Sequence, residues 1–373
     1  MKGKVLQENL AKALQIANRF VSVKAQLPIL GNILFEAKKN KVLISATNLE
    51  LSISLSLGAQ IAKEGKLSLP AKNLTDFVVN LPKGTINFEA EKEQLKLESE
   101  NFNSTFSGMD PSDFPEIPAT LAKEKMKLPS EDLLFSLSQV LFSVSTDETR
   151  PVLTGVLILF KEDSIVFVAT DGFRLSQKKI KIKKGERSIS ETKLILPKNA
   201  LAEITRLAGG EEEISLSLQK EENQAIFEVD NQILTSRVIE GEFPDFEKII
   251  PKETKLKVNV DKEDFLRAVK LASVFARDSA NVIKLSFTKS SLEIEAESAQ
   301  SGSQKGSVEA KTEGEVEKDF VIAFNYRFIE DFLGAVKGDD INIELNDANS
   351  PGVFTDPKDP DYLHLIMPVK LTT

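Results

Sequence analysis

The sequence predicts an α+β protein built from three copies of one domain, because short motifs recur about a third of the chain apart. ATN at Ala46–Asn48 returns as ATD at Ala169–Asp171, 123 residues later. LPAKN begins at Leu69 and returns as LPKN at Leu196, 127 residues later. Such a period is that of a domain, since solenoid repeats are only roughly 20–50 residues long. The expected domains are residues 1–122, 123–252 and 253–373.

Each copy opens with a predicted amphipathic helix, in which apolar residues recur at three- and four-residue spacing. Ser130 and Asp261 are expected to cap the second and third of these helices, since acidic residues follow each of them. The three apolar stripes contain Leu10, Ala13, Leu14, Ala17 and Val21; Leu133, Leu137, Val140, Leu141 and Val144; and Phe265, Val269, Ala272 and Phe275.

Alternating apolar and polar residues follow, as in half-buried antiparallel strands. Clear examples are KVLISATNLELSISLSL from Lys41 and DINIEL from Asp340. A second amphipathic helix comes later in each copy and ends at a glycine-bearing turn. We therefore expect each copy to place two helices on one face of a curved antiparallel sheet. The second set of stripes contains Leu74, Phe77, Val78 and Leu81; Leu201, Ile204 and Leu207; and Phe328, Ile329, Phe332 and Val336.

Composition restricts the class of protein. Of the 373 residues, 41% are hydrophobic and 28% are charged, as in folded soluble proteins. The chain contains no cysteine, which excludes disulfides and thiolate metal sites. The first residues read as an amphipathic helix rather than a signal peptide, and no apolar stretch approaches the roughly 20 residues that span a bilayer. We expect a soluble cytoplasmic protein.

The net charge of −9 argues against a nucleic-acid-binding protein, unless the charge is unevenly distributed. Acidic residues are dense in strand and turn segments, such as Glu89–Glu100 and Ala310–Asp319. This distribution predicts a basic helical surface and an acidic sheet surface; the alternative is that the helical cations are ordinary solvated residues. The predicted helices and the turns beside them carry Lys12, Arg19, Lys24, Lys72, Lys198, Arg206, Lys262, Arg267, Lys270, Arg277 and Arg327.

Residues suited to catalysis are scarce. The single histidine, His364, lies in a predicted strand, so a histidine-based metal site or a catalytic pair is not expected. GSQKGS near Gly302 lacks the spacing of a phosphate-binding loop. The segment Thr355–Asp361 lacks the glycine and glutamate of a calcium loop. We expect no cofactor, no metal and no enzymatic activity.

Five segments resemble the bacterial DNA polymerase III beta subunits, the beta sliding clamps, in order and spacing. They are LPILGNI from Leu27, VATDGFRLS from Val168, EGEFPDFEKIIP from Glu240, the FN of AFNYRF at Phe324, and LIMPVKL from Leu365. The resemblance covers essentially the whole chain. It implies a homodimeric, head-to-tail ring of six domains that encircles double-stranded DNA without reading its sequence. The implied partners are DNA polymerase subunits and the clamp loader, with no membrane partner.

The resemblance also implies site residues. DNA contacts are expected at Lys24, Lys72, Lys198 and Arg206, and the interface between protomers at Phe106 and Met109 of one copy and Leu271, Val274 and Phe275 of the other. Asp147 lies in a loop where DNA-facing residues are expected, and its charge disfavours phosphate contact. A peptide-binding pocket between the second and third domains is expected to use Arg150, Leu153, Thr170, Gly172, Phe173, Arg174, Leu175, Pro244, Lys248, Ile249, Asn325, Phe328, Ser350, Ile366, Met367, Pro368, Val369, Lys370 and Leu371.

Two departures from the family pattern bear on this pocket. Phe173 stands where a polar residue is common and makes the pocket more apolar, and Lys248 replaces a frequent arginine and loses its planar fork. Leu153, Ile249 and Ile366 are open to the alternative reading of domain core. Two other functions stay open: a peptide-binding scaffold of this fold that does not encircle DNA, and a hydrolase on an unrelated fold. The first copy is expected to lack a docking site.

Overall fold

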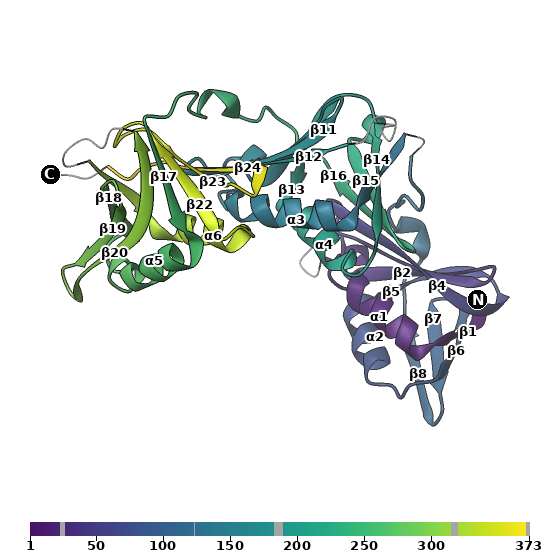
Figure 1. The fold of residues 1–373 in the computed structure, drawn as a ribbon. Helices are drawn as coiled ribbons and strands as arrows, with labels where there is room; N and C mark the ends of the chain where they lie inside the picture. Colours follow the sequence, from purple (N-terminus) through teal and green to yellow (C-terminus); the bar gives the residue numbers. More distant parts are fainter. Residues whose placement is uncertain (23–26, 123, 183–188, 315–319, 371–373) are drawn as a thin grey trace. The chain divides into compact units, whose positions relative to one another are not determined.

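A computed structural model describes residues 1–373 except 23–26, 123, 183–188, 315–319 and 371–373 (Figure 1). The contacts divide the chain into two compact units. The first contains Met1–Ser130 and Glu203–Val238, and the second contains Glu131–Ala202 and Ile239–Thr373. Each unit has its own twelve-stranded sheet, in which all the strand pairs are antiparallel.

The sheet of the first unit joins strands from two copies of the repeat. Strand β4 (Leu51–Lys63) pairs with β1 (Lys2–Leu6) near its end and with β16 (Gln232–Arg237) near its start. The path of the sheet is β8 (Phe102–Ser107), β7 (Gln94–Ser99), β6 (Thr85–Glu91), β1, β4, β16, β15 (Gln224–Val229), β14 (Glu213–Gln219) and β9 (Lys125–Pro129), with β2 (Asn32–Lys38), β3 (Lys41–Thr47) and β5 (Gly65–Pro70) beside it.

Helices α1 (Gln7–Ala17) and α2 (Ala71–Val79) pack together in the first unit (Figure 1). The buried side chain of Gln7 donates from Nε2 to the carbonyl oxygen of Val78 at 2.8 Å, which ties the two helices. Leu10, Ala13, Leu14 and Ala17 are buried as predicted. Val21 and Leu81 lie beyond the ends of these helices.

The sheet of the second unit likewise crosses a copy boundary, where β12 (Arg174–Lys181) pairs with β24 (Asp359–Ile366). Its helices are α3 (Ser130–Val140), α5 (Lys262–Ala276) and α6 (Tyr326–Ala335), while α4 (Lys198–Leu207) begins in this unit and ends in the first. The strand order is β13 (Thr192–Pro197), β10 (Gly155–Phe160), β11 (Ser164–Thr170), β12, β24, β23 (Gly352–Asp356), β22 (Asp340–Leu345), β17 (Leu256–Asp261), β20 (Gly302–Gly314), β19 (Ser291–Ser298), β18 (Val282–Phe287) and β21 (Val321–Asn325).

Of the two N-caps predicted from the sequence, one is confirmed and the other is wrong. Asp261 caps α5, since its Oδ1 accepts a hydrogen bond from the Asp264 amide at 2.9 Å. The expected cap at Ser130 is wrong, because Ser130 is already the first residue of α3 and its buried Oγ has no hydrogen-bond partner among the described residues. Helix α3 also ends at Val140, so Leu141 falls in the 3-10 helix η3 (Leu141–Ser143) and Val144 follows it.

His364 lies inside the core of the second unit, as a strand residue should. Its ring stacks on Phe332, with centroids 5.6 Å apart, and its Nδ1 is 2.8 Å from Ser176 Oγ. Burial disfavours the charged ring and lowers the pKa of His364 to about 3. The histidine is therefore neutral and structural.

Candidate functional site

The central feature of the candidate site is a tight turn between β11 and β12. Thr170 Oγ1 donates to the carbonyl oxygen of Arg174 at 2.6 Å and accepts from the amide of Gly172 at 3.1 Å. Asp171 Oδ1 accepts from the amides of Phe173 and Arg174 at 2.9 and 3.0 Å. Gly172 adopts a φ of +93°, which glycine tolerates at little cost. The turn leaves Phe173 63% exposed.

The C-terminal segment lies directly beside this turn. Arg174 pairs in register with Ile366, and the amide of Met367 donates to the carbonyl oxygen of Phe173 at 2.8 Å. Strand β24 ends at Ile366, as expected from Pro368, which cannot donate to a sheet. The amide of Val369 then donates to the carbonyl oxygen of Ala323 at 2.8 Å. Residues about 200 positions apart thus form one surface.

The predicted pocket residues divide into a buried layer and an exposed layer. Leu153, Thr170, Leu175 and Ile366 are less than 9% exposed, so they support the surface from below as part of the domain core. The exposed apolar residues are Phe173, Ile249, Met367 and Val369, which are 63, 44, 38 and 36% exposed. Pro244, Lys248 and Lys370 are also exposed, and Leu371 lies outside the described residues. We call the four exposed apolar residues the docking surface.

Arg174 does not project from this surface. Its side chain is 11% exposed, and it forms ion pairs with Asp171 at 3.0 Å and Asp331 at 2.5 Å. The guanidinium also lies 4.5 Å from the ring centroid of Phe328 and donates to the carbonyl oxygen of Phe142. Arg174 therefore joins the turn to α6 and η3. Sequence reasoning missed Asp331 and Phe142, because no local pattern links them to Arg174.

Other predicted pocket residues bond within their own loops. Lys248 pairs with Asp245 at 2.8 Å, and Ser350 Oγ donates to Asp347 at 2.7 Å. Asn325 caps α6 by accepting from the Arg327 amide at 3.0 Å. Arg150 pairs with Asp147 at 3.0 Å and donates to the carbonyl oxygen of Asp171 at 3.4 Å. Hydrogen bonds from Thr149, and then from Arg150, hold the pKa of Asp147 below its usual value, so this loop keeps a negative charge.

The predicted DNA-contacting cations have different surroundings. Lys72 is exposed on α2 and Lys198 is half-buried at the start of α4, and no described carboxylate lies within ion-pair distance of either ammonium group. Arg206 pairs with Glu203, which also binds Arg19 at 2.8 Å. Lys24 lies outside the described residues.

The expected contrast between acidic sheets and basic helices is only partial. Lysines on the strands pair with neighbouring carboxylates, as Lys127 does with Glu213 at 2.6 Å and Lys305 with Glu293 at 3.0 Å. The described sheet faces therefore carry both signs of charge.

The predicted interface residues fall in both units. In the first, Phe106 is half-buried on β8, packs edge-on against Phe77 at 5.4 Å, and lies near the 39% exposed Met109. In the second, Leu271 and Val274 are 55 and 54% exposed on α5, whereas Phe275 packs against the core. All five residues are thus at least partly exposed, Phe106 and Phe275 less than the other three.

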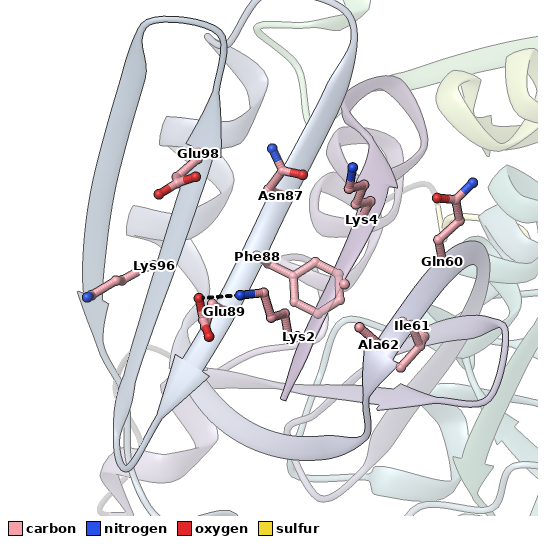
Figure 2. Close-up of a pocket in the computed structure, with 11 residues that line it drawn as sticks. Lys2, Lys4, Gln60, Ile61, Ala62, Asn87, Phe88, Glu89, Lys96 and Glu98 are labelled. Atoms are coloured by element: carbon pink, nitrogen blue, oxygen red, sulfur yellow. Dashed lines mark hydrogen bonds and ion pairs between the residues drawn. The ribbon is translucent and has the colours of Figure 1, made fainter.

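Figure 2 shows a cavity of about 480 Å³ over strands β1, β4, β6 and β7 of the first unit. Lys2 pairs with Glu89 at 3.0 Å across it, and its lining includes none of the predicted site residues. Within the described ranges, no cluster of three His, Cys, Asp or Glu could hold a metal ion. No helix in these ranges is long and apolar enough to cross a membrane.

Comparison with known proteins gives a consistent result. The DNA polymerase III beta subunit matches by its N-terminal domain over residues 1–118, its central domain over 127–245 and its C-terminal domain over 247–370. The beta sliding clamp of Synechocystis is 33% identical over 98% of both chains, and that of Staphylococcus aureus is 30% identical over 94% of both. The solved sliding clamp of Bacillus subtilis is 26% identical over 100% of both chains with a TM-score of 0.94. The DNA polymerase III beta subunit of Thermotoga maritima, also 26% identical over 100% of both, gives 0.89.

The repeated domains, their sheets and these similarities define a polymerase accessory protein with three clamp domains. The chain belongs to the DNA polymerase III beta subunit family, the beta sliding clamps. Members of this family are non-catalytic processivity subunits of the polymerase, which confirms the expectation that the chain is not an enzyme. The fold class expected from the sequence is likewise confirmed.

Proposed function

We propose that two copies of this chain close head to tail into a ring around duplex DNA and tether DNA polymerases to their template. The observation that carries this proposal is the match of all three beta-subunit domains, in order, to nearly the whole chain. A head-to-tail contact that closes after two copies gives a ring rather than a filament. Topology then holds the protein on DNA, so tight binding is unnecessary.

The proposed partners are duplex DNA of any sequence, DNA polymerase subunits, a clamp loader and a second copy of the chain, in the cytoplasm and without a cofactor. Lys24, Lys72, Lys198 and Arg206 contact phosphates and give a salt-sensitive attraction that carries no sequence information. Lys72 is the strongest of the described cations in this role, because it is exposed and no described carboxylate neutralises it. Arg206 contributes less, since Glu203 already binds it.

The docking surface takes an extended peptide from a polymerase or a clamp loader. Phe173, Ile249, Met367 and Val369 supply apolar contact, and methionine adapts to different side chains. The family resemblance assigns Arg150, Pro244, Lys248, Ser350, Lys370 and Leu371 to the rim of this site. The buried Leu153, Leu175 and Ile366 fix the positions of the residues above them.

The two protomers meet through the first domain of one and the third domain of the other. Strand β8 ends the sheet of the first unit and leaves one edge open to pairing. Phe106 and Met109 flank this edge, and Leu271 and Val274 present apolar surface on α5 of the other copy.

Loading on DNA tests the proposal directly. The protein is loaded on nicked circular DNA and the circle is then linearised. A ring is retained on the circle and slides off the free ends after linearisation. Retention after linearisation, or no retention on the circle at high salt, contradicts encirclement. The alternative function, a peptide-binding scaffold that does not encircle DNA, would then be favoured.

A further inference from the structure

The turn that presents Phe173 has a close counterpart in the first copy of the repeat. Thr47 Oγ1 donates to the carbonyl oxygen of Leu51 at 3.1 Å and accepts from the amide of Leu49 at 3.0 Å. Asn48 Oδ1 accepts from the amides of Glu50 and Leu51 at 3.0 and 2.8 Å. These are the same four hydrogen bonds that shape residues 170–174.

The elements around the turn are repeated as well. The amide of Arg237, at the end of β16, donates to the carbonyl oxygen of Glu50 at 2.9 Å, as Met367 does to Phe173. The amide of Ser22 donates to the carbonyl oxygen of Leu30 at 2.8 Å, as Ser145 does to Leu153 at 2.9 Å. The first unit therefore contains the main-chain frame of the docking surface. In this frame Leu27 corresponds to Arg150, Leu49 to Gly172, Glu50 to Phe173 and Arg237 to Met367.

The side chains on this second frame are unusual for an exposed loop. Leu49 has a φ of +75°, a conformation that costs a bulky residue about 1 kcal/mol or more. It is 46% exposed, so core packing does not offset the strain. Leu27 is 56% exposed. In the second unit, a Cβ at position 172 would lie 3.2 Å from the Arg150 guanidinium. By the correspondence of the two frames, Leu49 and Leu27 are therefore expected to be neighbours.

An acidic cavity adjoins the frame. The cavity has a volume of about 820 Å³, and Ile117 connects it to the frame, because Ile117 lines the cavity and packs against the core of Ile29, Leu30 and Phe114. Its apolar lining includes Leu121 and Leu218. Its charged lining is Glu116, Glu124, Glu221, Glu222 and Lys220.

We propose that this frame and cavity form a second docking site, which takes an extended peptide from another protein. The peptide carries a large apolar side chain, which packs on Leu27 and Leu49, and basic residues, which face the four glutamates. Charge complementarity sets this site apart from the docking surface, whose exposed core is apolar. The inference rests on the proposed function and extends it, since it gives the same frame the same role at a second place. It replaces the expectation that the first copy lacks a docking site.

The test measures binding of a fluorescein-labelled peptide, Lys-Lys-Leu-Phe-Lys-Lys, to the full chain by anisotropy. We expect Leu27→Ser to weaken binding at least fivefold and Leu49→Gly at least tenfold. The glycine variant also relieves the strained φ, so its melting temperature should rise while binding falls. A purely structural role for Leu49 cannot give that combination. The charge-reversed peptide, Glu-Glu-Leu-Phe-Glu-Glu, should not bind.

Serine is chosen at position 27 because it removes the apolar side chain without adding a charge that attracts the lysines of the probe. Undiminished binding in Leu27→Ser and Leu49→Gly, or loss only in Phe173→Ser, overturns the proposal. Absence of probe binding to the unaltered chain also overturns it. A lower solution mass for Leu27→Ser than for the unaltered chain overturns it as well, because the site would then bind a second copy of this chain. Retention on circular DNA does not depend on Leu27 or Leu49. The ring assay can therefore fail while peptide binding at this site is found, and peptide binding can fail while the ring assay succeeds.

Discussion

The amide of Met367 is bonded to the carbonyl oxygen of Phe173 at 2.8 Å, so the C-terminal segment and the turn after β11 hold each other in place. Both side chains are exposed, and neither takes part in this main-chain hydrogen bond. Their identities can therefore change without altering the main-chain frame. This separation makes the docking surface suitable for side-chain substitution.

Phe173→Ser should weaken binding of a polymerase-derived clamp peptide by roughly tenfold or more. Burial of an aromatic side chain contributes about 1.5–3 kcal/mol, and this substitution removes it without touching the turn. Isothermal titration of the peptide measures the change. Phe102→Ser is the control, because Phe102 is 52% exposed and belongs to the first unit, whereas all four residues of the docking surface belong to the second. An equal loss in both variants contradicts the assignment.

Removal of Met367–Leu371 should abolish peptide binding and leave the dimer intact. Met367 and Val369 are half of the docking surface, whereas the expected dimer residues lie elsewhere. Sedimentation of the truncated chain gives the mass and titration gives the affinity. Loss of the dimer would mean that these residues are structural.

Arg174→Met should lower the stability of the second unit by about 2 kcal/mol. The change leaves Asp171 and Asp331 without their cation; loss of one partner of a buried pair costs about 3–5 kcal/mol, and the 43% exposure of Asp331 reduces this. Thermal unfolding monitors the change. Arg150→Met, which breaks an exposed pair, should lower the melting temperature much less than Arg174→Met does. Similar melting temperatures for the two variants contradict the structural role of Arg174.

Stability should fall as the pH is lowered from 7 to 5, in part because of His364. Its pKa is about 3 in the folded chain and near 6.5 when unfolded, so below pH 6.5 the unfolded chain binds the extra proton. The stabilisation is complete above pH 6.5 and decreases by about 1.4 kcal/mol per pH unit as the pH falls toward 3. His364→Gln should flatten this part of the profile. Because the chain has one histidine, its ring signal in NMR should show no titration between pH 7 and 5.

Lys72→Ala should reduce the salt dependence of DNA binding more than Arg206→Ala. Each phosphate contact contributes a slope of about one in log affinity against log salt concentration. Lys72 has no described carboxylate partner, whereas Arg206 shares Glu203 with Arg19. Affinity for duplex DNA, measured at several salt concentrations, gives the slopes. Equal slopes for both variants would show that Glu203 does not weaken Arg206.

The double variant Leu271→Glu and Val274→Glu should convert the dimer to a monomer. Two charges on an exposed apolar face add a desolvation cost to association, while the fold, which leaves both residues exposed, is unaffected. Scattering should show a mass of 41.2 kDa in place of about twice that value. An unchanged mass places the interface elsewhere.

The sequence predicted the parts of this fold that depend on local pattern. Asp261 precedes acids at a helix start and does cap α5, and the alternating strands were found where expected. Ser130 shows the limit of such patterns. Strand β9 ends at Pro129 and helix α3 begins directly at Ser130, one residue before the predicted start, so Ser130 is inside the helix and does not cap it. The motif at Ala169–Asp171 marked the turn, but it could not show which side of the turn faces solvent.

Long-range contacts could not be predicted. The partner of Arg174 on α6 is 157 residues away, and nothing in either segment links the two. The predicted pocket therefore mixed ligand-facing residues such as Phe173 with buried supports such as Leu175. Likewise, ATNLEL has Leu49 at the position that Gly172 occupies in ATDGFR, and the hydrogen bonds show that both segments nevertheless fold into the same turn.

Strand β4 pairs with β1 of its own copy and with β16 of the next, and β12 pairs with β24 in the same way. Each sheet therefore continues across a boundary between copies, although the third copy also has a hydrophobic core of its own. A recombinant fragment ending at residue 122 would retain β4 but expose Leu51–Leu55 as an open edge, which favours aggregation. Dissection of this protein into thirds would break both sheets, and neither compact unit can be expressed as one uninterrupted stretch of the gene.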